Sequence, residues 1–136
     1  MNFLVAYNHS RVARAALSMA RDHAQRFNAK VFVMTSMGGG EKATPEAIKK
    51  VENRLESAKQ FIREKEIECE TYRLVQGRSP GEDIVWFVKE NEIDLVFIGI
   101  EKKSRTEKII LGSTAQFVIL KSQCPVTTVK SYTAAS

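Results

Sequence analysis

Cysteine is scarce in this sequence, and long apolar runs and a secretory leader are missing. The 136 residues include only two cysteines, Cys69 and Cys124, which lie far apart in or beside apparent strands. We therefore expect buried thiols rather than a disulfide framework or a cysteine zinc site. No stretch is long and apolar enough to cross a bilayer, and the N-terminus lacks the charged start and cleavage site of a signal peptide. These absences favour a soluble, cytoplasmic protein that has no membrane partner.

Charge of one sign does not dominate any part of the chain. The net charge is +5, from 21 Lys and Arg against 16 Asp and Glu, and acidic residues are interspersed among the basic ones. This mixture is typical of a solvated surface, so nucleic acid is not expected as a partner. The two histidines, His9 and His23, have no partner at metal-ligand spacing. His23 falls on a predicted helix surface, whereas His9 fits a structural role and a ligand contact equally well.

Short apolar runs alternate with stretches of helical periodicity. Uninterrupted or β-compatible runs predict buried strands at residues 3–6, 31–34, 68–75, 95–99 and 125–129. Apolar residues at steps of three and four predict helices at 11–27, 44–62, 79–91 and 113–122. Each crossover is long enough to connect parallel neighbours. The fold class is therefore α/β, a three-layer doubly wound open sheet of five parallel strands in the order 3-2-1-4-5, with helices on both faces.

Local signals define the helix starts and the extent of the domain. Thr44 precedes Pro45 as an N-cap residue, and Ser79 with Glu82 forms a capping box. Trp86 falls in a helix rich in apolar residues and is expected on its core face. Residues 1–130 are expected to form a single domain, and residues 131–136 a flexible tail.

A binding site is expected where the strand order reverses, because ligands of open α/β sheets lie beyond the carboxyl ends of the strands there. The loop after residues 95–99 is the most informative. Gly99 ends a strand, and Gly112 with Ser113 opens a helix after a loop rich in Lys and Arg. Free amide groups and the helix dipole at such a start suit a phosphate. The same residues also fit a solvated loop before an ordinary helix, and their spacing alone favours that second interpretation.

A longer motif connects these positions. It reads Gly99-x-x-Lys102, nine residues, Gly112-Ser113, and later Cys124-Pro125-Val126. This pattern resembles the signature G-x-x-G-x9-G-[ST] and the closing C-P-V of the universal stress protein family. The opening segment VAYNHS, residues 5–10, is similar to the V-A-V-D-G-S of that family. The resemblance covers nearly the whole chain and departs from the motif at Asn8, His9 and Lys102, where the family has aspartate, glycine and glycine.

The resemblance implies an adenine nucleotide, ATP or AMP, with or without magnesium. Its adenine would lie near the loops after the first two strands, its ribose by Gly99, and its phosphates over Gly112 and Ser113. Lys102 is expected to direct its ammonium group onto the phosphates. The predicted nucleotide-binding residues are Ala6, Tyr7, Asn8, Ser10, Ser36, Gly99, Lys102, Ser104, Gly112, Ser113 and Thr114.

The predicted function is regulatory nucleotide binding in a stress response, not enzymatic turnover. No residue pair combines a strong general base with a positioned nucleophile, so ATP hydrolysis would be slow at most. The resemblance also implies a homodimer through the last strand, at Val126, Thr127, Thr128 and Val129, whose edge would otherwise be open. One alternative stays open, an interaction protein of the same type that has lost ATP binding. An ATP-pyrophosphatase is disfavoured, because residues 8–10 lack a glycine-rich phosphate loop.

Overall fold

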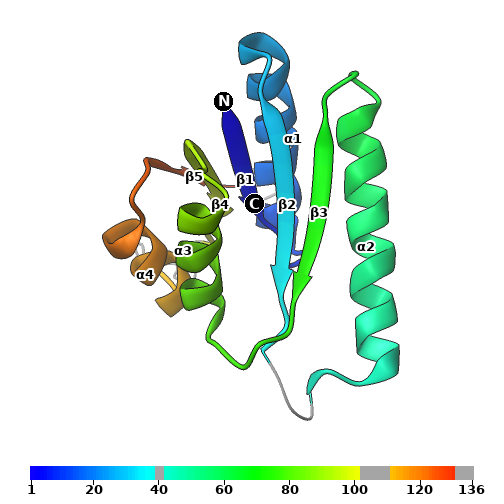
Figure 1. Ribbon diagram of the computed structural model, residues 1–136, viewed down its shortest axis with the longest axis vertical. Coiled ribbons are helices and arrows are strands. Elements are labelled where there is room, and N and C mark those ends of the chain that lie inside the picture. The colour runs from blue at the N-terminus through cyan, green and yellow to red at the C-terminus, as the bar shows by residue number, and fades with distance from the viewer. Residues whose placement is uncertain (39–41, 102–110, 131–136) are drawn as a thin grey trace.

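A five-stranded parallel sheet organises the protein (Figure 1). The computed structural model describes residues 1–38, 42–101 and 111–130. The strands are β1 (Asn2–Ala6), β2 (Lys30–Ser36), β3 (Cys69–Leu74), β4 (Leu95–Gly99) and β5 (Val126–Val129). The helices are α1 (Arg11–Phe27), α2 (Pro45–Arg63), α3 (Pro80–Glu90) and α4 (Ser113–Lys121). The sheet order is β3-β2-β1-β4-β5, which confirms the predicted fold class and strand order.

The central strand β1 is enclosed on every side. It pairs in parallel with β2, where Leu4 lies opposite Phe32, and with β4, where Leu4 lies opposite Val96. Leu4 and Val5 are completely buried. A parallel strand covered on both faces needs apolar residues without alternation, which explains the continuous run at its centre.

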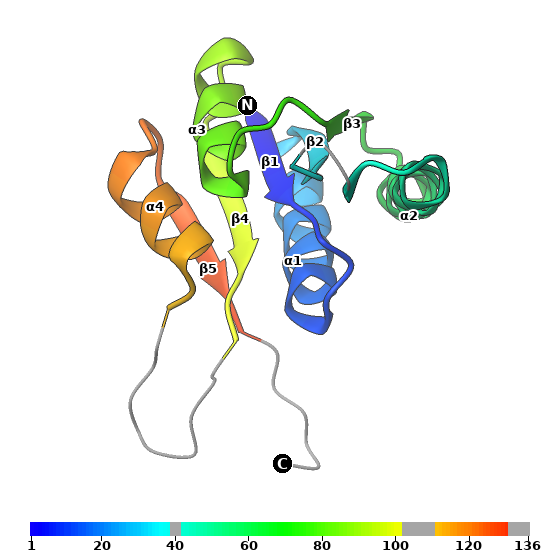
Figure 2. The same ribbon diagram turned by 90° about the horizontal axis from the view of Figure 1, so that it is seen from below.

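Helices cover both faces of the sheet (Figure 2). Alanines of α1 and Leu55, Ala58 and Ile62 of α2 pack with Val5 and Val31 into one apolar cluster. On the opposite face, side chains of α3 and α4 pack with Leu4 and Met34 into a second cluster. Within the part of the chain that the structure describes, none of the helices combines the length and apolarity needed to span a bilayer. The three layers therefore leave the loops at the carboxyl edge as the place where the chain can hold a ligand.

The predicted helix starts are confirmed. The Thr44 side chain accepts a hydrogen bond from the N–H of Ala47. Ser79 and Glu82 form the reciprocal capping box at the start of α3. The prediction for Trp86 was wrong, because this side chain is 36% exposed while Phe87 beside it is 1% exposed. Trp86 lies at the margin of the apolar face of α3, where the Arg78 guanidinium stacks on its ring at 4.5 Å.

Gly99 allows α1 to approach the end of β4. A Cβ atom built on Gly99 would lie 2.5 Å from the carbonyl oxygen of Val12 and 2.8 Å from the amide nitrogen of Ala13. Both neighbours are backbone atoms, which cannot move aside as a flexible side chain would. The glycine therefore sets the distance between the first turn of α1 and the sheet. Gly112 is different, since a Cβ there would meet no atom within 4 Å.

We expect Gly99→Ala to lower the free energy of unfolding by about 3 kcal/mol, the upper end of the usual range for overpacking, because the added methyl group meets the backbone. Urea denaturation followed by circular dichroism measures this difference. Gly112→Ala is the matched control and should cost less than about 1 kcal/mol, the scale of an N-cap change. Equal losses in the two variants would contradict the close approach of α1 to β4.

Candidate functional site

A cavity of about 430 Å³ opens at the carboxyl edge of the sheet, where β1 lies between β2 and β4. This is the point at which the strand order reverses. Its wall combines residues from the ends of β1, β2 and β4 with the first turns of α1, α3 and α4. The lining residues are Ala6, Tyr7, Asn8, Ser10, Val12, Ala13, Met34, Ser36, Pro80, Ile84, Ile98, Gly99, Ile100, Glu101, Gly112, Ser113, Thr114 and Ala115.

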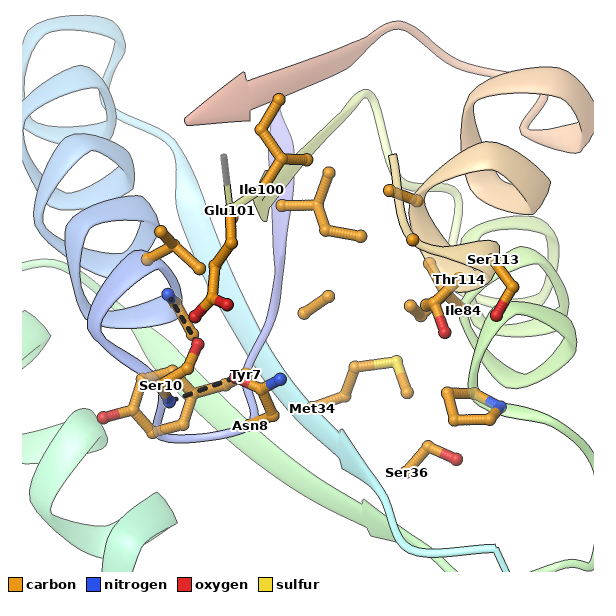
Figure 3. A pocket seen from close by; sticks show the side chains of 18 residues that line it. Tyr7, Asn8, Ser10, Met34, Ser36, Ile84, Ile100, Glu101, Ser113 and Thr114 are labelled. Carbon is orange, nitrogen blue, oxygen red and sulfur yellow. Dashed lines mark hydrogen bonds between the residues drawn. The ribbon is translucent and has the colours of Figure 1, made fainter. Parts of the chain in front are cut away.

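The structure brings the described members of the predicted site together. Figure 3 shows residues of the β1–α1 loop facing Ser113 and Thr114 of α4 across the cavity, with Met34 and Ser36 along its floor. The predicted residues in the lining are Ala6, Tyr7, Asn8, Ser10, Ser36, Gly99, Gly112, Ser113 and Thr114. Lys102 and Ser104, also predicted, lie outside the described residues. Segments separated by more than a hundred positions in the chain thus share one wall.

Several lining residues escaped the sequence analysis. Pro80 and Ile84 come from α3, which was predicted as a capped helix with a core face, and Met34 was predicted as the last residue of a buried strand. The spacing of apolar residues along a helix or strand predicts which side chains are buried, but it does not indicate which end of the element borders a cavity. Glu101 follows Ile100 in the loop after β4, and Figure 3 shows its carboxylate pointing into the cavity. Its position two residues after Gly99 was the available signal, because it lies in the loop from which the binding site was predicted.

Short hydrogen bonds hold the β1–α1 loop against β2. The N–H of Tyr7 donates to the carbonyl of Met34 at 2.8 Å, and Thr35 Oγ1 donates to the carbonyl of Tyr7 at 2.6 Å. Asn8 Oδ1 accepts from the N–H of Ser10 at 3.1 Å, which closes a local turn. Ser10 in turn caps α1, because its Oγ accepts from the N–H of Ala13 at 3.2 Å. Hydrogen bonds to β2, within the loop and to the first turn of α1 thus hold the loop in place without a ligand.

His9 takes the backbone conformation that usually belongs to glycine. Its φ angle is 63°, in the left-handed region. The side chain is exposed and does not line the cavity, and its Nδ1 lies 3.2 Å from the hydroxyl of Tyr7. Desolvation and the charges of Arg54 and Arg14 lower the pKa of His9. Burial raises the pKa of the Tyr7 hydroxyl, although the same two guanidinium groups oppose that change. Positive charge therefore surrounds the turn that leads into α1.

The first turn of α4 presents uncommitted amide groups to the cavity. Gly112 is its N-cap at φ −65° and ψ 161°, and no side chain caps the helix. The carbonyl of Gly112 accepts from the N–H of Gln116 at 3.1 Å, so the helix begins there. The amides of the three residues before Gln116 have no partner within the helix. An open N-terminus of this kind attracts an anion through its N–H groups and its dipole.

Few acidic groups surround the cavity. Among its described lining residues, Glu101 is the one carboxylate. Within residues 1–38, 42–101 and 111–130, His, Cys, Asp and Glu do not gather in groups of three that could hold a metal ion. Magnesium is commonly held by one or two carboxylates together with substrate phosphates. The described residues fit magnesium only as a companion of bound phosphates, with Glu101 as its protein carboxylate.

An ion pair with a buried carboxylate lies behind the floor of the cavity. Asp83, in the first turn of α3, is 0% exposed. Its Oδ2 accepts a hydrogen bond of 2.6 Å from Ser36 Oγ, and its Oδ1 lies 3.0 Å from Nε of Arg78. Ser36 lines the cavity and Asp83 does not. Asp83 therefore orients a hydroxyl group that faces the ligand, although it does not reach the cavity itself.

Comparison with known sequences places this architecture among related proteins. The family described as the universal stress protein family matches residues 1–130. A universal stress protein of Thermus aquaticus is 30% identical over an alignment of 136 positions that covers 93% of this chain and 96% of that protein. A shorter match, 41% identical over 51 residues, links 38% of this chain to universal stress protein MJ0531 of Methanocaldococcus jannaschii, of which it covers 30%.

Solved structures share the whole fold. A universal stress protein from Archaeoglobus fulgidus superposes with a TM-score of 0.84 at 35% identity, covering 96% of this chain and 93% of that one. A universal stress protein from the same organism, solved in complex with dAMP, has a TM-score of 0.77 at 32% identity and covers 95% of each chain. The similarity therefore extends over both sides of the cavity.

Proposed function

The chain belongs to the universal stress protein family, and on that premise we propose that it is a regulatory protein that binds an adenine nucleotide, ATP or AMP. The observation that carries this proposal is the cavity of about 430 Å³ at the strand-order reversal, open to the uncapped first turn of α4. Ligand cavities commonly measure roughly 300–1,000 Å³, so a nucleotide is of suitable size. The dAMP bound by the Archaeoglobus fulgidus relative supports the same ligand class.

The phosphates belong at α4 in this proposal. The amides of its first turn, the hydroxyl groups of Ser113 and Thr114, and the helix dipole all favour negative charge. Gly112 leaves space beside these groups, since among the described residues no atom other than those of its chain neighbours lies within 4 Å of its Cβ position. Lys102 and Ser104 remain proposed phosphate contacts from the adjoining loop. The ribose would then lie over Gly99, between the two loops.

Binding rather than fast turnover is the proposed activity. Hydrolysis needs a base that can activate water beside the phosphates. Among the described lining residues, Glu101 and Tyr7 are the titratable groups, and Tyr7 is directed toward His9. Asn8, which replaces the family aspartate, uses its Oδ1 within the loop. We infer that the nucleotide acts as a signal in a stress response and that hydrolysis is slow at most.

One alternative has its own support. Asn8 and Lys102 depart from the family motif, and a relative that had lost ATP binding would act through protein contacts alone. The open cavity argues against this alternative, because the described side chains do not fill it. Thermal melting with and without nucleotide separates the two, since a ligand at 100 times its Kd adds about 2.7 kcal/mol to the stability.

A homodimer is proposed through β5. This strand pairs with β4 on one side and forms an edge of the described sheet on the other. The carbonyl of Pro125 accepts from Val96 of β4 and that of Val129 from Ile100 just after it, so the alternation of backbone groups turns those of Val126 and Thr128 outward. The neighbouring helix α4 also leaves Leu120 78% exposed. A second copy pairing with this edge would satisfy the backbone groups and cover apolar surface.

The remaining elements of the proposal concern the setting of the protein. Residues 1–130, the range of the family match, would act as one domain, and residues 131–136 as a tail. We place the protein in the cytoplasm, without a membrane or nucleic-acid partner. Acidic residues dispersed among the basic ones support the last point.

Substitutions at Gly112 should separate charge from shape. We expect Gly112→Asp to bind AMP about tenfold more weakly than Gly112→Asn, about 1.4 kcal/mol, because both side chains cap α4 but only aspartate opposes the phosphate. Isothermal titration calorimetry measures both affinities. Adenosine is the matched uncharged ligand and should not distinguish the variants. Equal AMP affinities for the two variants would place the phosphate elsewhere.

Chelation should affect the two nucleotides differently. We expect EDTA to leave AMP affinity within about twofold, because Asn8 and the described lining offer a metal little besides Glu101. ATP affinity is expected to fall on chelation if magnesium arrives on its phosphates. Titrations of both nucleotides with magnesium and with EDTA provide the comparison. Loss of AMP binding in EDTA would show that the site itself requires a metal.

Thr128→Pro should yield a folded monomer. Proline removes an N–H that points away from β4, so it blocks strand pairing at the edge and leaves the β4 ladder intact. Thr128→Ala keeps that N–H and is expected to remain a dimer. Size-exclusion chromatography with light scattering measures the mass, and circular dichroism checks the fold. A dimeric Thr128→Pro variant would exclude β5 as the interface.

A further inference from the structure

Asp83 is an unusual group to find behind a ligand cavity. Among the described residues it is the one charged side chain that is fully buried, at 0% exposed. A buried carboxylate is costly unless it is paired. Arg78 supplies the opposing charge, with its Nε 3.0 Å from Oδ1, although the geometry does not form a hydrogen bond to that oxygen. The hydrogen bond that Asp83 does receive comes from Ser36.

This hydrogen bond determines whether the Ser36 hydroxyl can donate or accept a hydrogen bond in the cavity. A carboxylate can only accept hydrogen bonds, and a serine hydroxyl has a single hydrogen to donate. The Ser36 Oγ to Asp83 Oδ2 distance of 2.6 Å is that of a charge-assisted bond, so the hydrogen is committed to Asp83. Only the lone pairs of Oγ remain for a ligand. Ser36 can therefore accept a hydrogen bond in the cavity but cannot donate one.

The surroundings of Ser36 decide which part of a nucleotide meets it. With its hydrogen committed to Asp83, Ser36 Oγ cannot donate to a phosphate oxygen, whereas the amides in the first turn of α4 can. Met34 beside Ser36 and Ile84 of α3 are apolar and buried (Figure 3). An uncharged ring fits this end of the cavity. The charged end of the ligand then lies at α4.

We propose that Ser36, oriented by Asp83, is a specificity-determining residue that selects a purine carrying a 6-amino group over one carrying a 6-oxo group. This inference rests on the proposed nucleotide function and adds to it the side chains that select the base. The amino group of adenine donates to Ser36 Oγ. The carbonyl oxygen of hypoxanthine or guanine at the same place would face lone pairs and leave both acceptors without a hydrogen, which is unfavourable in a desolvated site.

AMP and inosine monophosphate make the sharpest comparison, because they share the ribose and phosphate and differ on the purine ring. Calorimetry of the wild-type chain should give at least about tenfold tighter binding of AMP, since a site that accepts a hydrogen bond rejects a ligand unable to donate it. In Ser36→Ala this ratio is expected to fall to about threefold or less, mainly through weaker AMP binding. Ser36→Thr retains a hydroxyl and should retain the preference.

Asp83→Asn tests the orienting role separately. The amide can donate as well as accept, so the Ser36 hydroxyl becomes free to turn toward the ligand. The AMP preference should then fall although Ser36 is intact. A purely structural role for Asp83 predicts another result, in which both ligands weaken by the same factor and their ratio is unchanged. Should Asp83→Asn fail to fold, Ser36→Ala alone still decides the proposal.

The outcomes distinguish this inference from the function it rests on. A wild-type chain that binds neither ligand would overturn the proposed nucleotide function. A wild-type chain that binds AMP and inosine monophosphate equally, or a Ser36→Ala variant that keeps the full preference, would overturn base selection by Ser36 while nucleotide binding stands. A ratio that falls in both Ser36→Ala and Asp83→Asn supports the whole arrangement.

Discussion

The contact between the first turn of α1 and the end of β4 is the constraint on which the site depends. Gly99 has no side chain, and the backbone of Val12 and Ala13 occupies the space that a Cβ would need. This approach brings the N-terminus of α1 to the same edge as the loop after β4. The β1–α1 loop is held on its other side by the 2.6 Å hydrogen bond from Thr35. One wall of the cavity is thereby preorganised by backbone contacts, and ligand binding need not order it.

The cavity combines two electrostatic environments. At one end, α4 presents amide groups and the hydroxyl groups of Ser113 and Thr114. At the other, Ser36 stands in front of a buried carboxylate, among apolar neighbours. A molecule with an anionic tail and an uncharged ring fits this gradient in one orientation only. Orientation therefore follows from charge before any shape complementarity is considered.

The fold could be predicted from the sequence, because buried parallel strands need continuous apolar runs and the helices that cover them need an apolar stripe along one face. The run at residues 3–6 and the periodicity from Arg11 to Phe27 each have one physical interpretation. The loops of the site followed from topology, since parallel strands end at a common edge. Asp83 could not be found in this way, because its role depends on how α3 packs against the end of β2. Trp86 was misplaced for a related reason, since periodicity alone does not separate the centre of a broad apolar face from its margin.

The stacking of Arg78 on Trp86 also has a practical consequence. Trp86 is the single tryptophan of the chain, and its ring is in contact with the guanidinium that pairs with Asp83, which in turn holds Ser36. A short series of contacts thus joins the interior of the cavity to an indole at the surface. Because indole emission responds to nearby charge and solvent, a shift of the Arg78 side chain on ligand binding would change the fluorescence of the unlabelled protein.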